Sequence, residues 1–216
     1  MSNLEQKTID KLFRDLIRVY STSATSMIGL DAIKMAITEL ACDEAGLADE
    51  INKLSDSIKK TQPRMFPLDN LMLILDREVQ FLLNANQLTK KSIINLIDDF
   101  KLRLDSDIDS LIQKSLEWVE DGDFIVIHSI EENIENLIPE ASQRGKKFKI
   151  LVLKQDIITT GKILKILKEN NIDFEVIPEY DLVHYFGEIT KLFIGTQALT
   201  NDNYIVCDSG TSNIVS

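Results

Sequence analysis

The sequence predicts an α/β protein in which a helical N-terminal domain precedes a doubly wound parallel sheet. Two observations support this fold class. Between Asp121 and Ser216, short runs rich in β-branched residues alternate with stretches of helical periodicity, and that alternation is typical of parallel strands joined by helical crossovers. Before this region, apolar residues recur at spacings of three and four, which is the pattern of a helix face.

Five helices are predicted in the first half of the chain. The second starts near Ser23 and runs towards Gly46, because a residue without a Cβ suits a helix end. The two prolines within residues 61–67 separate the third helix from the fourth. The first helix has an apolar face made by Leu12, Phe13, Leu16, Ile17 and Tyr20, and the last three are expected over about residues 47–58, 69–83 and 89–118. The last is long enough to connect two domains.

Four short apolar runs are the predicted strands: Phe124–His128, Lys149–Leu153, Phe174–Pro178 and Lys191–Gly195. The change of pattern at residues 119–123 places a helical domain at residues 1–118 and an α/β domain at residues 119–216. Ligands of such sheets bind at the carboxyl ends of the strands. Function is therefore expected among the residues that leave those ends, which are residues 128–129, 154–156, 178–180, 195–197 and 208–211.

Composition indicates a cytoplasmic protein that does not bind nucleic acid directly. The chain has 35 acidic and 24 basic residues and a net charge of −11, which repels phosphate backbones. Two cysteines, Cys42 and Cys207, are too few for a disulfide framework or a zinc site, and Cys207 is expected to be a buried strand residue. No apolar run approaches the roughly 20 residues of a membrane span. We expect no metal and no cofactor.

Residues 120–129, Glu-Asp-Gly-Asp-Phe-Ile-Val-Ile-His-Ser, resemble the first sheet strand of the translation initiation factor 2B alpha/beta/delta family. That family includes methylthioribose-1-phosphate isomerase and ribose-1,5-bisphosphate isomerase. Further similarities follow in the family's order at residues 140–149, Gly161 before a helix, Ile172, residues 191–195 and residues 210–212, with weaker ones upstream at residues 24–25 and 62–70. The resemblance covers nearly the whole chain and implies a Rossmann-like sheet domain after the helical one.

The chain departs from the isomerase branch of this family at the positions that carry chemistry. The resemblance places Ile130 where the catalytic thiol would stand and Gln197 where the catalytic carboxylate would stand. Neither side chain can exchange a proton near neutral pH, as sugar isomerisation requires. Two arginines that would hold a sugar phosphate are also replaced, in residues 62–64 and 153–157. These losses favour a pseudoenzyme over an active enzyme.

Three functions stay open at this stage. By resemblance, the first is a non-catalytic regulatory subunit that acts through protein contacts in the guanine-nucleotide exchange assembly of translation initiation. The second is a sugar-phosphate isomerase, of the ribose-1,5-bisphosphate or methylthioribose-1-phosphate type, in which Asp202 or Asp208 replaces the lost carboxylate. The third is a small-molecule-sensing α/β domain unrelated to translation. The loss of the thiol, the carboxylate and two arginines together favours the first over the second.

A weak site for a phosphorylated sugar or nucleotide is expected at the strand ends. Its predicted residues are Arg64, His128, Ser129, Gln197, Gly210 and Thr211, with Arg64 reaching from the helical domain to the phosphate. Each has a simpler explanation. His128 fits a hydrogen-bonded strand end, and residues 210–212 fit a plain helix N-cap.

In the family that the sequence resembles, the segment matching residues 210–212 is followed by a helix, another strand and a C-terminal segment. The resemblance therefore implies a sheet truncated at Ser216, as a natural short form or as a piece of a longer chain. An uncovered edge would then lie near Tyr204–Cys207 and Phe193–Ile194. Open apolar edges are seldom left exposed. We therefore expect association with a second copy, as a homodimer, or with related subunits.

Overall fold

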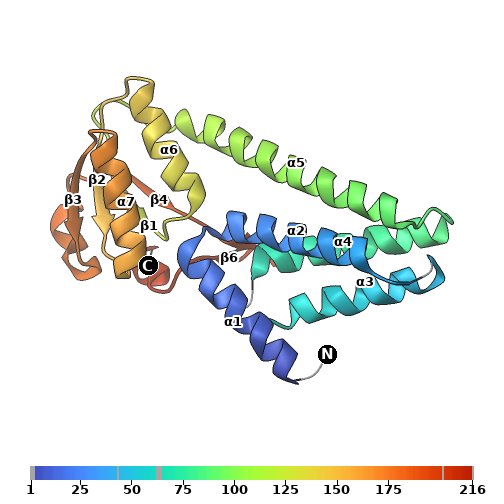
Figure 1. The fold of residues 1–216 in the computed structure, drawn as a ribbon. Helices are drawn as coiled ribbons and strands as arrows, with labels where there is room; N and C mark the ends of the chain where they lie inside the picture. Colours follow the sequence, from blue (N-terminus) through green and yellow to red (C-terminus); the bar gives the residue numbers. More distant parts are fainter. Residues whose placement is uncertain (1–2, 43, 62–64, 201, 216) are drawn as a thin grey trace. The chain divides into compact units, whose positions relative to one another are not determined.

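The computed structural model describes residues 3–42, 44–61, 65–200 and 202–215, and it divides into two compact units, Met1–Ser106 and Asp107–Ser216 (Figure 1). The first unit is helical. Its helices are α1 (Asn3–Val19), α2 (Thr22–Glu39), α3 (Glu44–Lys59), α4 (Phe66–Asn84) and the first part of α5 (Lys90–Leu116). No helix within the described residues is long and apolar enough to cross a lipid bilayer.

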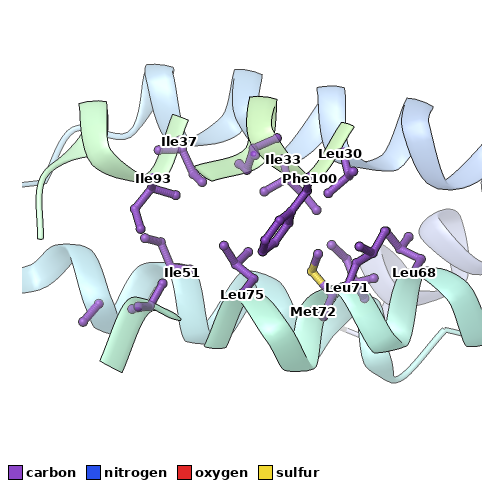
Figure 2. Packing of buried hydrophobic residues seen from close by; sticks show 14 of the residues in the cluster. Leu30, Ile33, Ile37, Ile51, Leu68, Leu71, Met72, Leu75, Ile93 and Phe100 are labelled. Atoms are coloured by element: carbon purple, nitrogen blue, oxygen red, sulfur yellow. The ribbon is translucent and has the colours of Figure 1, made fainter. Parts of the chain in front are cut away.

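Apolar side chains spaced by three and four along α2, α4 and α5 meet in the core of the helical unit (Figure 2). Leu30, Ile33 and Ile37 of α2 are buried, and a Cβ at Gly29 would lie 2.9 Å from a methyl carbon of Leu68 on α4. Each such large side chain contributes roughly 1.5–3 kcal/mol when it is fully buried. The other core residues labelled in Figure 2 are Ile51, Leu71, Met72, Leu75, Ile93 and Phe100.

The five predicted helices are present, but one predicted boundary is wrong. Helix α2 is capped at Ser21, whose hydroxyl accepts from the backbone N–H of Ala24 at 3.1 Å, and it ends at Glu39. Gly46, which was expected at the end of this helix, lies inside α3. A single glycine inside a helix costs only about 1 kcal/mol, so the packing of α3 against α4 outweighs it. Pro67 occupies the first turn of α4, where its missing N–H is tolerated.

The second unit contains a four-stranded parallel sheet with the order β3-β2-β1-β4. The strands are β1 (Phe124–His128), β2 (Lys149–Leu153), β3 (Asp173–Ile177) and β4 (Lys191–Ile194), so the predicted fold class and all four predicted strands are confirmed, within one residue at each end. Helices α6 (Glu132–Gln143) and α7 (Ile157–Glu169) follow β1 and β2, and the 3₁₀ helix η1 (Glu179–Tyr185) follows β3.

Both faces of this sheet are apolar, as expected for parallel strands covered on two sides. One face, which includes Ile125, Ile127, Ile150 and Val152, packs against α6, α7 and the last turns of α5. The opposite face, which includes Val126, Leu151 and Leu153, packs against η1 and the short helix α8 (Thr211–Val215). The boundary between the two compact units lies inside α5. The predicted domain boundary after residue 118 concerns which part folds independently, and it stays a prediction.

The segment after β4 forms a separate antiparallel pair, β5 (Ala198–Leu199) and β6 (Ile205–Val206), which is not part of the parallel sheet. The turn is closed by a hydrogen bond from the N–H of Thr200 to the carbonyl of Tyr204 at 2.8 Å, with Asn203 in the left-handed region. Cys207 lies just after β6 and is half-buried, so the expectation of a buried strand cysteine is wrong.

Candidate functional site

The strand order fixes where a ligand site would lie in this unit. The chain winds from β1 through β2 to β3 and then returns to the other side of β1 as β4, so its direction reverses between β1 and β4. Loops diverge at such a switch point, and their divergence creates the usual binding site of an open parallel sheet. Residues that leave the carboxyl ends of these strands are therefore the candidate site.

The backbones that leave β1 and its edge-strand neighbour β4 lie very close together at this point. The N–H of Gly195 donates to the carbonyl of His128 at 3.2 Å, and a Cβ at position 195 would lie 2.0 Å from the carbonyl oxygen of Ser129. No side chain fits there. Ser129 itself has a φ of 50°, a left-handed conformation that is uncommon outside glycine. The backbone at the switch point is therefore closely constrained.

His128 is fully buried and is held through both ring nitrogens. Nδ1 lies 3.1 Å from Oγ1 of Thr211, and Nε2 lies 3.0 Å from Oε1 of Glu179. The Thr211 hydroxyl donates its proton to the carbonyl of Asp208 at 2.8 Å, so it accepts from Nδ1. An ionised Glu179 is also an acceptor. Both ring nitrogens of His128 are therefore engaged with side chains of the chain.

Asp208 ties three strand ends together. Its Oδ1 accepts from the side-chain amide of Gln197 at 3.0 Å, and its Oδ2 accepts from that of Gln155 at 2.9 Å. Its backbone N–H donates to the hydroxyl of Ser129 at 2.9 Å. Since Gln155 follows β2, Gln197 follows β4 and Ser129 follows β1, the Asp208 loop closes over the carboxyl end of the sheet. We call these residues, with His128, Glu179 and Thr211, the strand-end cluster.

The thiol nearest this cluster is poorly suited to nucleophilic chemistry. Burial raises the pKa of the Cys207 thiol, and the carboxylates of Asp208 and Glu131 raise it further, against a hydrogen bond with Ser129 that lowers it. The thiolate is the reactive form of cysteine. Cys207 is therefore protonated at neutral pH.

The structure brings four of the six predicted ligand residues into the strand-end cluster: His128, Ser129, Gln197 and Thr211. Gly210 lies beside it with a φ of +96°, and a Cβ there would lie 2.8 Å from Oε1 of Glu179. Arg64 lies outside the described residues, so its role stays a prediction. Thr211 opens a helix of only five residues, and its hydroxyl faces His128 and Asp208.

Three members of the cluster were not in the predicted ligand set: Gln155, Glu179 and Asp208. All three belong to segments that leave strand ends, and Asp208 is also one of the two carboxylates that the isomerase alternative requires. In the hydrogen bonds that join the described members of this cluster, the side-chain donors are imidazole, amide and hydroxyl groups rather than lysine or arginine. Within the same described parts of the chain, no three His, Cys, Asp or Glu side chains gather as metal ligands would.

Comparison with known families and proteins gives a consistent result. Residues 18–215 match the model of the initiation factor 2 subunit family. A putative translation initiation factor eIF-2B subunit 2-like protein of Pyrococcus horikoshii is 26% identical over 195 residues, which cover 90% of this chain and 67% of that protein. The eIF2B subunit delta of Schizosaccharomyces pombe is 25% identical, over 78% of this chain and 37% of that subunit. Ribose 1,5-bisphosphate isomerase of Haloferax volcanii is 20% identical, over 93% and 62%.

Solved structures agree on the fold. The crystal structure of the Pyrococcus horikoshii eIF-2B protein superposes with a TM-score of 0.75 at 24% identity, covering 94% of this chain and 71% of that one. The tetrameric eIF2B-beta2-delta2 complex of Chaetomium thermophilum contains a chain that superposes with a TM-score of 0.75 at 15% identity, covering 95% and 70%. This chain thus spans about two thirds of the length of several of its relatives.

Proposed function

The chain belongs to the initiation factor 2 subunit family, and we propose that it acts without catalysis, as a subunit of an initiation factor 2B-like assembly that regulates guanine-nucleotide exchange in translation initiation. The named relatives support the translation branch of the family. The beta and delta subunits of Chaetomium thermophilum form a tetramer, so contact with related subunits or with a second copy is the expected mode of action.

The observation that carries this proposal is that hydrogen bonds within the chain already engage both carboxylate oxygens of Asp208. An isomerase needs a group that can move a proton between neighbouring sugar carbons. Gln197 cannot do so, and Asp208 is the carboxylate beside it. Both oxygens of Asp208 already accept hydrogen bonds from amides of this chain, so the carboxylate serves as an anchor for Gln155 and Gln197. This use favours a structural role over a catalytic one.

His128 supports the same conclusion. Both of its ring nitrogens are engaged with residues of the chain, and its side chain is inaccessible to solvent. A general acid or base must come within hydrogen-bond reach of the substrate proton it moves. His128 would have to release Glu179 or Thr211 to do this.

A weak site for a phosphorylated metabolite remains part of the proposal. With Arg64 as its one predicted cation, the site would bind in the micromolar range or more weakly, at about −8 kcal/mol or less favourable. Arg64→Ala should abolish a thermal shift induced by ribose phosphates, because binding stabilises the native state by mass action. An unchanged shift in this variant would place the ligand elsewhere.

One observation favours the second candidate, a sugar-phosphate isomerase. The Haloferax volcanii isomerase aligns over 93% of this chain, and Cys207 and Asp208 put a thiol and a carboxylate beside Ser129 at the switch point. Asp208 would have to take the catalytic role. Asp202, the other replacement considered, is exposed in the turn between β5 and β6. The third candidate, a small-molecule-sensing α/β domain unrelated to translation, is less favoured, because the relatives include named translation factors.

Affinity capture of the tagged chain from its native host, followed by native mass spectrometry, tests the proposed assembly. We expect other members of the initiation factor 2 subunit family in fixed stoichiometry with the chain. A chain that remains free of them, while the same preparation holds its usual helical content by circular dichroism, would contradict the proposal.

A further inference from the structure

The 3₁₀ helix η1 presents an apolar row that the fold does not use. A 3₁₀ helix has three residues per turn, so residues three apart lie directly above one another. In η1 the row of Glu179, Leu182 and Tyr185 faces the protein. Glu179 binds His128, Leu182 is buried, and the Tyr185 hydroxyl donates to Glu175 at 2.9 Å.

The neighbouring row consists of Tyr180, Val183 and Phe186, which are 79%, 58% and 65% exposed. We call it the outer row. Since aromatic side chains carry roughly 150–250 Å² each, these three expose on the order of 300–400 Å² of mostly apolar surface. An area of this order matches the largest apolar patch of a typical soluble monomer, and such patches are often functional.

The surroundings of the outer row are acidic. Residues 169–190 contain no lysine or arginine, and Asp181 and Glu188 flank the row along the chain. Glu179 is paired with His128 and Glu175 with Lys149, and Lys149 also attracts Glu188, so the acidic side chains in this region outnumber the one lysine that faces them. A second copy would bring the same acidic segment and a net charge of −11, so like charges would oppose its docking here.

We propose that the outer row binds an amphipathic helix of a partner polypeptide whose apolar face is flanked by lysine or arginine. From Tyr180 to Phe186 the row rises about 12 Å at 2 Å per residue. Apolar residues at i and i+7 of an α-helix are separated by about 10.5 Å, so two turns of a helix match its length. Basic residues beside that face would meet Asp181 and Glu188. The inference goes beyond the proposed assembly, because it identifies a surface and the chemistry of what binds it.

Fluorescence anisotropy with two labelled 18-residue model helices tests this surface. Both carry leucines at helical spacing, and the remaining positions are lysine in one and glutamate in the other. We expect the lysine helix to bind the full chain in the micromolar range and the glutamate helix to bind at least tenfold more weakly. Combined Tyr180→Ser, Val183→Ser and Phe186→Ser should weaken the lysine helix at least tenfold, although this variant keeps the net charge.

A matched control is available in the β5–β6 pair, where Leu199, Tyr204 and Ile205 are 63%, 71% and 57% exposed. Their replacement by serine should leave binding of the lysine helix unchanged. Equal loss in both triple variants, or no loss in the η1 variant, would overturn the proposal.

A further variant, Asp181→Lys with Glu188→Lys, retains the apolar row and decides the case if the η1 variant misfolds. It should reverse the preference to the glutamate helix, and an unchanged preference would contradict the proposal.

Discussion

The two ends of the parallel sheet are both held by buried polar side chains, but by different chemistry. At the amino end, Asp123 accepts from the ammonium of Lys191 at 2.8 Å, from the hydroxyl of Thr190 at 2.7 Å and from the N–H of Glu120 at 2.7 Å. This is a charge pair, and its lysine is partly exposed to solvent. At the carboxyl end, Asp208 is held by two amides and His128 is fully buried.

The difference matters because the carboxyl end is where such sheets bind ligands. The amino end is expected to be a structural tie, meaning side-chain contacts that hold neighbouring strand ends together. A charge pair at a solvent-accessible edge is sufficient for that role. Here each side chain of the strand-end cluster contacts another side chain or a backbone group of the chain, as a second structural tie would require. This arrangement supports the proposal that the chain acts without catalysis.

Replacing His128 should have the largest effect on stability. His128→Ala removes a fully buried ring and leaves Glu179 and Thr211 without their common partner, so we expect a loss of about 2–4 kcal/mol in the free energy of unfolding. Urea denaturation of the wild-type and variant proteins measures this loss in the free energy of unfolding. His184→Ala is the matched control, because His184 is exposed on η1, and it should change stability by less than about 0.5 kcal/mol. Equal effects would mean that the carboxyl end is not a structural tie.

The amino-end tie should be sensitive to acid. Burial alone would raise the pKa of Asp123, but the hydrogen bonds from Lys191, from Glu120 and from Thr190 outweigh it and hold the pKa below its usual value. Because the folded-state pKa is depressed, ionised Asp123 stabilises the protein above the unfolded-state pKa of about 3.9, and this stability is lost as pH falls through the folded-state pKa.

Asp123→Asn should therefore cost about 1–3 kcal/mol at pH 7 and progressively less in acid. Urea midpoints of the two proteins from pH 7 to pH 3 give the comparison. A difference that stayed constant down to pH 3 would show that the Asp123 charge is not what holds the amino end.

Asp208→Asn should have a smaller effect. An asparagine can still accept from one of the two glutamine amides, but its own amide would face the other donor. We expect a loss of about 1–2 kcal/mol, measured in the same denaturation experiment. Unchanged stability would indicate that the two amide contacts are not part of a tie.

The smallest effect should come from Cys207. Since burial raises the pKa of its thiol, alkylation by iodoacetamide at pH 7 should be slower at Cys207 than in an unfolded reference of the same chain, and the rate should rise with pH beyond pH 9. Peptide mass spectrometry after timed quenching measures the rate. Rapid modification of Cys207 at pH 7 would show that its thiol is reactive at neutral pH, and Cys207 would then be a candidate nucleophile.

Sequence patterns predicted the central strands because the apolar runs that form β1 and β2 are buried on both faces, as at Phe124–His128. The strands β3 and β4 are less buried, and their short runs between helices indicated them. The patterns placed the candidate site at the strand ends, because the carboxyl ends of parallel strands meet at one edge of the sheet. They could not predict the partners within it. Asp208 meets Gln155 across 53 residues, and that contact depends on loop geometry that no periodicity encodes. The strands β5 and β6 have two residues each, too short for an alternating pattern to appear.

Phosphorus NMR of ribose 1,5-bisphosphate incubated with the intact chain tests whether the carboxyl end of the sheet is a structural tie or a catalytic centre. For a structural tie, we expect no turnover above buffer by the wild-type protein, together with the loss of stability in Asp208→Asn. Turnover by the wild-type protein that disappears in a folded Asp208→Asn variant would contradict it and would identify Asp208 as a catalytic residue.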